Sequence, residues 1–219
     1  MRGLRPQPDA VLLTGDLADH ATDEEYELLR ELLAPLSAHL YALPGNHDDR
    51  AALRRHFGVP GADGEPVQYS VDLGPLRLLV LDTTRPGEDP GELDAGRLEW
   101  LDSELGGAPE QLTIVAMHHA PLATGIPVWD DLGLPLAHLQ ALGTVIERHP
   151  QVRRLVAGHV HSTMSSDLAG CPVLAVPSTY AQARLDFTLE EIELYAEPAG
   201  FAVHAVVDGD LVSHVQPVR

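Results

Sequence analysis

A short polar loop, Gly45-Asn46-His47-Asp48, places an amide, an imidazole and a carboxyl group directly after an apolar run. The run, residues 39–43, has the length of a β-strand, and ligands of open α/β sheets bind beyond the carboxyl ends of the strands. An amide oxygen and an imidazole at that position can hold a metal ion or contact an anion. The same residues also fit an ordinary turn in which Asp48 caps the following helix, so this loop alone leaves both interpretations open.

Other apolar runs of strand length end in the same kinds of side chain. They are Ala10–Thr14 before Gly15-Asp16, residues 112–117 before His118-His119, and residues 155–157 before Gly158-His159-Val160-His161. Because the carboxyl ends of parallel strands meet at one edge of a sheet, these side chains are predicted to converge with Asn46 on one site. Carboxylate and amide oxygens combined with imidazoles suit Mn²⁺, Fe or Zn²⁺ better than Ca²⁺ or Mg²⁺. Four independent turns and helix caps in this order are the weaker interpretation.

Helical segments alternate with these strands over the first three quarters of the chain. Helical spacing predicts helices over residues 22–37, where Thr22 and Glu25 have capping-box spacing, and over 49–57, 94–105 and 136–148. Residues 67–81 indicate a β-hairpin that leads into a buried strand. The last quarter favours strands at 164–168, 173–176, 201–207 and 211–215. This order predicts an α/β fold with a second sheet packed on the first.

Composition narrows the possible partners. The 219 residues fit one domain, and a net charge of −19 argues against a nucleic-acid or anionic-membrane surface, so a bound cation would have to attract any phosphate. Cys171 is the only cysteine, which excludes an intrachain disulfide and favours a reducing compartment. Neither a membrane span nor a signal peptide is predicted, and we therefore expect a cytoplasmic protein.

Two further segments are candidates for the walls of the site. Residues 120–135 form a long irregular connection that contains Trp129, and a loop of this length beside a site is more often a lid or a substrate wall than filler. Packing is the favoured role for the Trp129 side chain itself. Thr179 and Tyr180 either line a substrate pocket or form a plain turn.

The motifs Thr14-Gly15-Asp16, Gly45-Asn46-His47-Asp48, His118-His119 and Gly158-His159-Val160-His161 resemble those of the calcineurin-like metallophosphoesterases. Longer stretches, residues 8–19 and 117–121 among them, are similar to class III cyclic-nucleotide phosphodiesterases and related glycerophosphodiesterases. The resemblance runs from Pro8 to about Val215. It implies a four-layer α-β-β-α sandwich of two mixed sheets flanked by helices. It also implies hydrolysis of a small-molecule phosphodiester, with 3′,5′-cyclic nucleotides first and glycerophosphodiesters or nucleotides as the alternative.

The resemblance also implies a role for each motif residue. Asp16 would bridge two metal ions, and Asn46, His118 and His159 would complete the second site, while His161 would bind the first ion. His118 and its neighbour His119 remain alternatives for the same ligand position. His47 would face the scissile phosphate and protonate or stabilise the leaving oxygen, and Asp48 would orient the His47 ring. A metal-activated hydroxide would attack phosphorus. Related enzymes are often dimers, so a homodimer is expected.

One motif of the family has no counterpart here. The family opens with a strand that ends in Asp-x-His, whereas only residues 1–7 stand ahead of the strand that leads to Asp16, and Asp19-His20 has the wrong spacing. On paper the first metal site keeps only Asp16 and His161. We expect a single domain that is incomplete at its N-terminus and lacks its first strand and helix. A one-metal variant of weak activity and a catalytically impaired metal-binding remnant are the alternatives.

Overall fold

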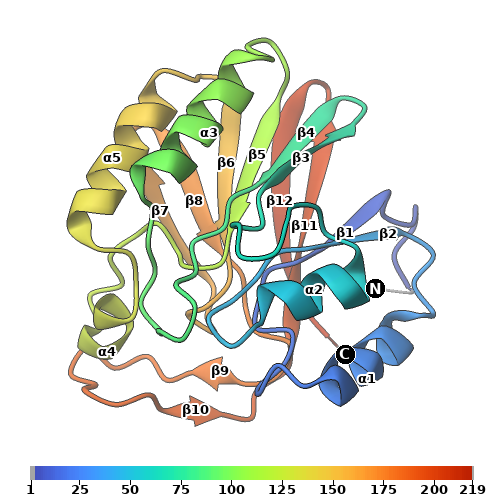
Figure 1. Ribbon diagram of the computed structural model, residues 1–219, viewed down its shortest axis with the longest axis vertical. Helices are drawn as coiled ribbons and strands as arrows, with labels where there is room; N and C mark the ends of the chain where they lie inside the picture. The colour runs from blue at the N-terminus through green and yellow to red at the C-terminus, as the bar shows by residue number, and fades with distance from the viewer. Residues whose placement is uncertain (1–2, 219) are drawn as a thin grey trace.

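Six strands form the central mixed sheet, in the order β3-β4-β5-β6-β8-β7. The computed structural model describes residues 3–218 and is shown in Figure 1. The strands are β3 (Tyr69–Leu73), β4 (Leu76–Val80), β5 (Thr113–Met117), β6 (Val152–Ala157), β7 (Met164–Leu168) and β8 (Cys171–Ala175). β4, β5, β6 and β8 run parallel, and the edge strands β3 and β7 run antiparallel to their neighbours. The carboxyl ends of the four parallel strands therefore share one edge.

Two helices cover one face of this sheet. They are α3 (Ala95–Gly106) and α5 (Leu136–Glu147), which lie side by side against the sheet in Figure 1. Successive residues of a strand point to opposite faces, so Leu79 and Val115 pack with the helices while Leu78 and Ile114 face the other way. Both sets are buried, as expected for parallel strands that are covered on both faces.

The opposite face packs against two separate pairs of strands. β1 (Ala10–Leu13) and β2 (His39–Ala42) are parallel, whereas β11 (Gly200–Val207) and β12 (Asp210–Pro217) form an antiparallel hairpin. Leu12, Tyr41 and Leu211 all contact the apolar cluster on this face. Within residues 3–218 the two pairs are not hydrogen-bonded to each other. The second mixed sheet that the resemblance implies is thus replaced by two strand pairs in one layer.

The outermost layer consists of α1 (Asp23–Leu33) and α2 (Arg50–Phe57). Tyr26 and Leu53, both fully buried, form a core with Ala42 at the end of β2. The order of layers is helices, sheet, strand pairs, helices, which confirms the predicted mixed α/β class. The remaining short elements are α4 (Pro127–Asp131), β9 (Gln182–Ala183) and β10 (Leu194–Tyr195), and the β9–β10 pair was not predicted.

Local signals set several element ends. The predicted capping box between Thr22 and Glu25 is present at α1. The cap of α2 is Asp49, whose carboxylate accepts a hydrogen bond from the backbone of Ala52, so the alternative in which Asp48 caps this helix is wrong. No helix among residues 3–218 is long and apolar enough to span a bilayer.

Candidate metal centre

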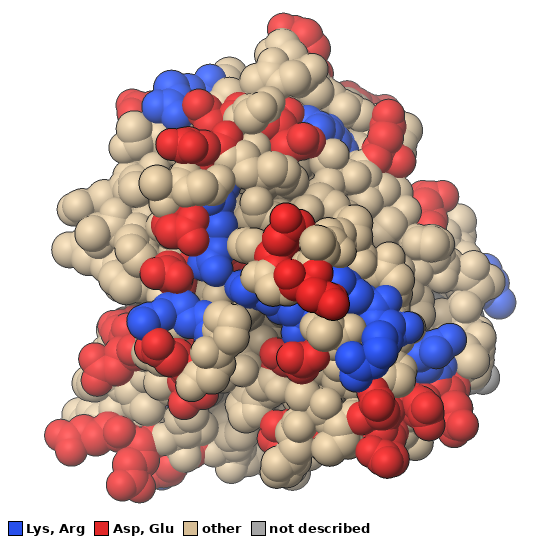
Figure 2. Space-filling view, in the orientation of Figure 1, with Lys and Arg blue, Asp and Glu red and all other residues tan. Residues whose placement is uncertain are grey.

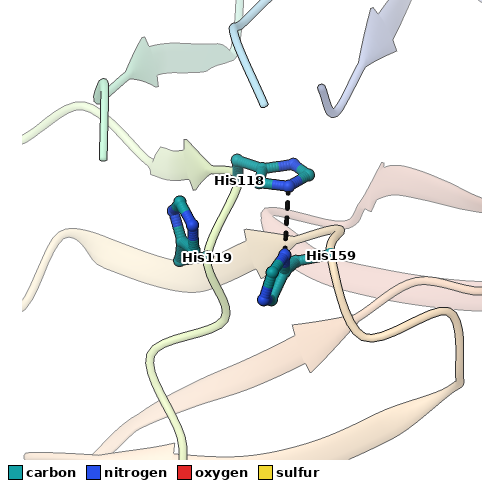
Figure 3. A group of neighbouring side chains, drawn as sticks. All are labelled: His118, His119 and His159. Carbon is teal, nitrogen blue, oxygen red and sulfur yellow. Dashed lines mark hydrogen bonds between the residues drawn. The ribbon is translucent and has the colours of Figure 1, made fainter. Parts of the chain in front are cut away.

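Three side chains, those of Asp16, Asn46 and His159, converge on the imidazole of His118. Each of the four residues follows the end of a strand. His118 follows β5, and its Nε2 lies 3.1 Å from Oδ1 of Asn46, 3.3 Å from Oδ2 of Asp16 and 3.2 Å from Nδ1 of His159. Figure 3 shows the last of these contacts and the approach of His118 and His159 from neighbouring loops. Asp16, Asn46, His118 and His159 are referred to below as the four-ligand cluster. The predicted convergence of these motifs is thus observed.

The hydrogen bonds of His118 direct Nε2 into this cluster. Nδ1 of His118 lies 2.8 Å from the carbonyl oxygen of Thr14, and because a carbonyl can only accept, Nδ1 carries the proton. In the neutral ring Nε2 carries no proton and faces the oxygens of Asp16 and Asn46, which are also acceptors. Such an arrangement needs a proton or a cation between the atoms. Although burial lowers the pKa of His118, the charge and hydrogen bond of Asp16 raise it above its ordinary value, so a proton takes this place where no metal is bound. Ligand atoms bound to one ion at about 2.0–2.2 Å lie about 3.0–3.5 Å apart, so the observed spacings fit a divalent metal.

The local electrostatics also favour metal binding. Burial alone would raise the pKa of Asp16, but the adjacent His118 and the backbone hydrogen bond from His47 lower it below its ordinary value. Burial, reinforced by the charge of His118, lowers the pKa of His159, and burial likewise lowers the pKa of His161. Asp16 is therefore ionised and both imidazoles are neutral near pH 7, which are the forms that ligate a metal. Nε2 of His159 is buried without a hydrogen-bond partner.

The backbone around the cluster adopts conformations that are rare for L-residues. Asp16, His159 and His161 have φ values of 53°, 66° and 45°. Each left-handed residue of this kind costs of order 1 kcal/mol and persists only where its surroundings enforce it. Gly45 has a different role, because an added Cβ would overlap both the carboxylate and the backbone of Asp16. The sharp turns allow side chains from two β layers to meet.

The hydrogen bonds distinguish His118 from His119. The ring nitrogens of His118, His119 and His159 lie close enough to share an ion. However, Nε2 of His119 lies 2.9 Å from the carbonyl oxygen of Asp89 and must donate, so Nδ1 accepts from the Thr83 hydroxyl at 2.8 Å. Burial lowers the pKa of His119 to about 3, so the ring stays neutral and both nitrogens remain engaged. This pattern favours His118 as the ligand and leaves His119 to hold the loop that contains Asp89.

His161 lies beside the cluster with one nitrogen available. Its Nδ1 lies 2.9 Å from the carbonyl oxygen of Ala181 and so donates, which leaves Nε2 for a ligand. The ring of Trp129 stacks on His161 at 6.1 Å between centroids and meets His159 edge-on at 5.7 Å. Trp129 is buried, as expected for a packing residue, and it covers the two histidines from α4. Thr179 and Tyr180, which precede Ala181 in the chain, are exposed.

His47 and Asp48 do not form the pair that the resemblance implies. Nδ1 of His47 lies 3.1 Å from the carbonyl oxygen of Asp19, and its side chain is about half exposed at the rim of the cluster. The carboxylate of Asp48 accepts hydrogen bonds from the backbone of Leu17 and Gly45 and from the hydroxyl of Tyr26. The expectation that Asp48 orients the His47 ring is therefore wrong. Asp48 links the loops that follow β1 and β2 by hydrogen bonds, and the backbone carbonyl of Asp19 orients the His47 ring.

The sequence did not indicate a supporting role for two residues of the site. Asp19 lies on the loop that follows Asp16, and Asp89 lies on the loop after β4, where its Oδ1 is 3.4 Å from the amide nitrogen of Asn46. This contact turns the amide oxygen of Asn46 toward His118. For Asp19, its position three residues after Asp16 in the sequence was the signal that could have indicated this role. Asp89 lies in an acidic, Gly- and Pro-rich loop that gave no signal.

With the geometry established, comparison with known proteins shows the family. Residues 2–163 match the family model described as calcineurin-like phosphoesterase. The chain belongs to the calcineurin-like phosphoesterase family. Membership assigns it to the phosphoester hydrolases, and the matched region contains the whole four-ligand cluster.

Individual relatives agree with this assignment. The chain is 31% identical to a glycerophosphodiester phosphodiesterase, GpdQ, of Enterobacter lignolyticus, over 98% of this chain and 78% of that protein. It is 34% identical to the 3′,5′-cyclic adenosine monophosphate phosphodiesterase CpdA of Pseudomonas aeruginosa, over 86% of this chain and 68% of that protein. A dimetal phosphatase of Danio rerio shares the fold, with a TM-score of 0.63 at 19% identity over 77% of this chain and 72% of that one.

Proposed function

We propose that this protein hydrolyses phosphodiesters with the help of divalent metal ions, and that 3′,5′-cyclic nucleotides are its substrates. The observation that carries the proposal is the convergence on His118 Nε2 of the oxygens of Asp16 and Asn46, at 3.3 and 3.1 Å, and of Nδ1 of His159, at 3.2 Å. The resemblance to CpdA favours a cyclic nucleotide.

Each residue of the site has a role in this proposal. The four-ligand cluster would hold one ion, and Asp16 with His161 would contribute to a second. A bound divalent ion supplies positive charge for the phosphate and lowers the pKa of water. His47 would protonate or stabilise the leaving oxygen from the rim, in an orientation set by Asp19. Trp129 would exclude water from the rings of His159 and His161.

The net charge of the chain favours a role for bound cations. Figure 2 shows acidic side chains at the margins and in the middle of one face, with arginines in a band among them. At a net charge of −19 the long-range field repels an anionic diester, and bound metal ions would supply positive charge at the site itself. We propose Mn²⁺, Fe or Zn²⁺, because the donors combine oxygen and imidazole nitrogen.

The first experiment measures metal content and hydrolysis of bis(p-nitrophenyl) phosphate on the same preparations. Asn46→Ala is expected to lose metal and activity together, whereas His47→Ala is expected to lose activity and keep its metal. His214→Ala is the matched control, since His214 is exposed on β12. Bound metal without turnover in the unmodified chain would contradict the enzymatic proposal and favour the metal-binding remnant.

A second experiment addresses the substrate. The resemblance to GpdQ supports glycerophosphodiesters as a specific alternative. Values of kcat/KM are compared for 3′,5′-cyclic AMP, 2′,3′-cyclic AMP and glycerophosphoethanolamine on the metal-loaded protein. The proposal expects the highest value with the 3′,5′-cyclic nucleotide. A higher value for glycerophosphoethanolamine would overturn the substrate assignment and leave the reaction type intact.

Cytoplasmic location and a homodimer stay predictions. The single cysteine supports the first. Light scattering of the purified chain measures its mass in solution and so tests the homodimer.

A further inference from the structure

A hollow lies at the opposite edge of the central sheet from the metal centre. Its volume is about 490 Å³, and its lining includes Glu147 at the end of α5, Val152 and Arg154 on β6, Cys171 and Pro172 at the start of β8, and Leu211 on β12. The metal ligands follow the carboxyl ends of β5 and β6, whereas this hollow lies where β6 and β8 begin. In Figure 1 this is the end of the sheet where the chain passes from α5 into β6.

Arg154 is the unusual side chain in this hollow. It is only partly exposed, and its Nε atom is buried without a hydrogen-bond partner. Other half-buried arginines are engaged: Arg50 pairs with Asp82 at 2.8 Å, and Arg54 donates to the carbonyl oxygen of Glu65 at 2.8 Å. Among residues 3–218, the side chain of Arg154 has neither an ion pair nor a hydrogen bond, in a chain with 33 acidic residues.

The neighbours of Arg154 do not neutralise it. A register shift in the pairing of β5 with β6 places Val152 opposite Thr113 and Arg154 opposite Ile114, so Arg153 is the extra residue of a bulge. Arg153 pairs with Asp210 of the β11–β12 hairpin at 3.3 Å, so the carboxylate of Asp210 is already engaged. His204 of β11 stays neutral near pH 7, because burial and the charge of Arg154 lower its pKa to about 4. Val152, Pro172 and Leu211 are apolar members of the lining. The lining also includes Glu147 and His149, and among residues 3–218 neither is paired with Arg154.

A guanidinium held in this way is a binding element for an oxyanion. Burying part of a charge without a partner is unfavourable. Nε of Arg154 is buried, whereas its two terminal nitrogens are not, and these two can donate to an anion with two oxygens side by side. The volume of the hollow lies in the range of small-molecule sites. We propose that Arg154 and the apolar side chains beside it bind a small organic oxyanion, a carboxylate or a phosphate ester, at a site separate from the metal centre. This proposal does not depend on the reaction catalysed at the other edge.

Calorimetric titration tests the proposal, with inorganic phosphate and succinate as separate probes. Both titrations use EDTA-treated protein, so that no metal binds phosphate, and chloride keeps the ionic strength constant. Saturable binding of at least one probe is expected, and the stronger probe distinguishes phosphate from carboxylate recognition. Arg154→Leu is expected to weaken binding by about tenfold or more, as for loss of a charge-assisted contact. Arg154→Lys, which keeps the charge without the fork, should fall between the two.

Arg153→Leu is the matched control: Arg153 also lines the hollow, but its guanidinium is already paired with Asp210 and should contribute little to binding. Thermal unfolding in chloride monitors the fold, and Arg154→Leu is expected to be no less stable than the unmodified chain. The proposal is overturned if neither probe binds saturably, if Arg154→Leu binds as well as the unmodified chain, or if Arg153→Leu loses as much affinity.

Discussion

Adjacent residues in this protein perform different tasks because their hydrogen bonds differ. His118 donates one ring proton to the carbonyl of Thr14 and aims its other nitrogen at Asp16 and Asn46. His119 uses both nitrogens to hold the loop that contains Asp89. The sequence could not separate the two, since each is a histidine at the end of a buried strand. Only the partners of each nitrogen reveal which lone pair is available.

This difference predicts opposite effects for two alanine variants. His118→Ala is expected to abolish metal binding, because it removes the central ligand. His119→Ala should lower the free energy of unfolding by about 2–4 kcal/mol, since it leaves a cavity and a buried hydroxyl unpaired. Its metal affinity should fall by about tenfold at most, as for loss of an outer support. Calorimetric metal titration and urea unfolding of both variants check the prediction, and retention of full metal affinity in His118→Ala would contradict it.

The thiol of Cys171 is predicted to be unreactive in the folded protein. Burial raises its pKa to about 11, and its sulfur lies 3.4 Å from the carbonyl oxygen of Val152. At pH 8 about one thiol in a thousand is then ionised, and only the thiolate reacts. Titration with Ellman's reagent should therefore label the native chain slowly and release one equivalent at once in guanidinium chloride. Rapid labelling without denaturant would show that the thiol is accessible.

At the scale of the elements, helix ends were more predictable than strand pairing. The capping box at α1 is local chemistry, and it is present as expected. Thr22→Ala removes it and is expected to cost about 1 kcal/mol of stability, measured by urea unfolding. Thr144→Ala is the control, because Thr144 is exposed on α5 and does not cap a helix. Equal losses of stability in both variants would show that the Thr22 cap does not stabilise α1.

The β11–β12 hairpin is predicted to make the protein sensitive to acid. His204 lies on β11 and donates or accepts a hydrogen bond with Ser213 of β12 at 2.8 Å. Burial, with the charge of Arg154, lowers its pKa from 6.5 to about 4 in the folded chain. Between these values the unfolded chain binds a proton that the folded chain does not. The free energy of unfolding is therefore unaffected by His204 above pH 6.5. It decreases as the pH falls from 6.5 toward 4, by up to about 1.4 kcal/mol per pH unit.

Urea unfolding at pH 7 and pH 4.5 measures this effect. His204→Gln should lose less stability between the two pH values than the unmodified chain, because its side chain does not titrate. His214→Gln is the matched control, since His214 is exposed on the neighbouring strand. A pH dependence that is the same in all three proteins would show that His204 does not contribute.

At the scale of the whole molecule, the sequence predicted the parts of the site that follow strands and missed the parts that support them. Asp16, Asn46, His118 and His159 meet because parallel strands place their carboxyl ends together. Asp82 also ends a buried strand, yet it is fully buried and holds Arg50 and the backbone of Val67. Its position in the sequence resembles that of Asp16, and only the packing of α2 distinguishes the two. The separation of the second β layer into two pairs also depends on long-range pairing, which has no local signal.

The metal centre joins two β layers, so metal binding and global stability should be linked. Asp16 and Asn46 follow β1 and β2, whereas His118 and His159 follow β5 and β6 of the central sheet. An ion that binds only the folded chain stabilises it by about 2.7 kcal/mol at a hundredfold excess over Kd. Gly45→Ala should remove this stabilisation, because the new Cβ would overlap Asp16. Thermal unfolding with and without Mn²⁺ measures the shift in Tm.

Gly106→Ala is the matched control for this prediction, since Gly106 lies at the end of α3 and a Cβ there meets no atom within 4 Å. It should keep the full Mn²⁺-dependent rise in Tm, whereas Gly45→Ala should show little rise and a lower Tm without metal. The reason is geometric, because the loop after β2 must pass within contact distance of the Asp16 backbone for the ligands of the two layers to meet. An undiminished metal response in Gly45→Ala would mean that this close approach is not needed to assemble the cluster.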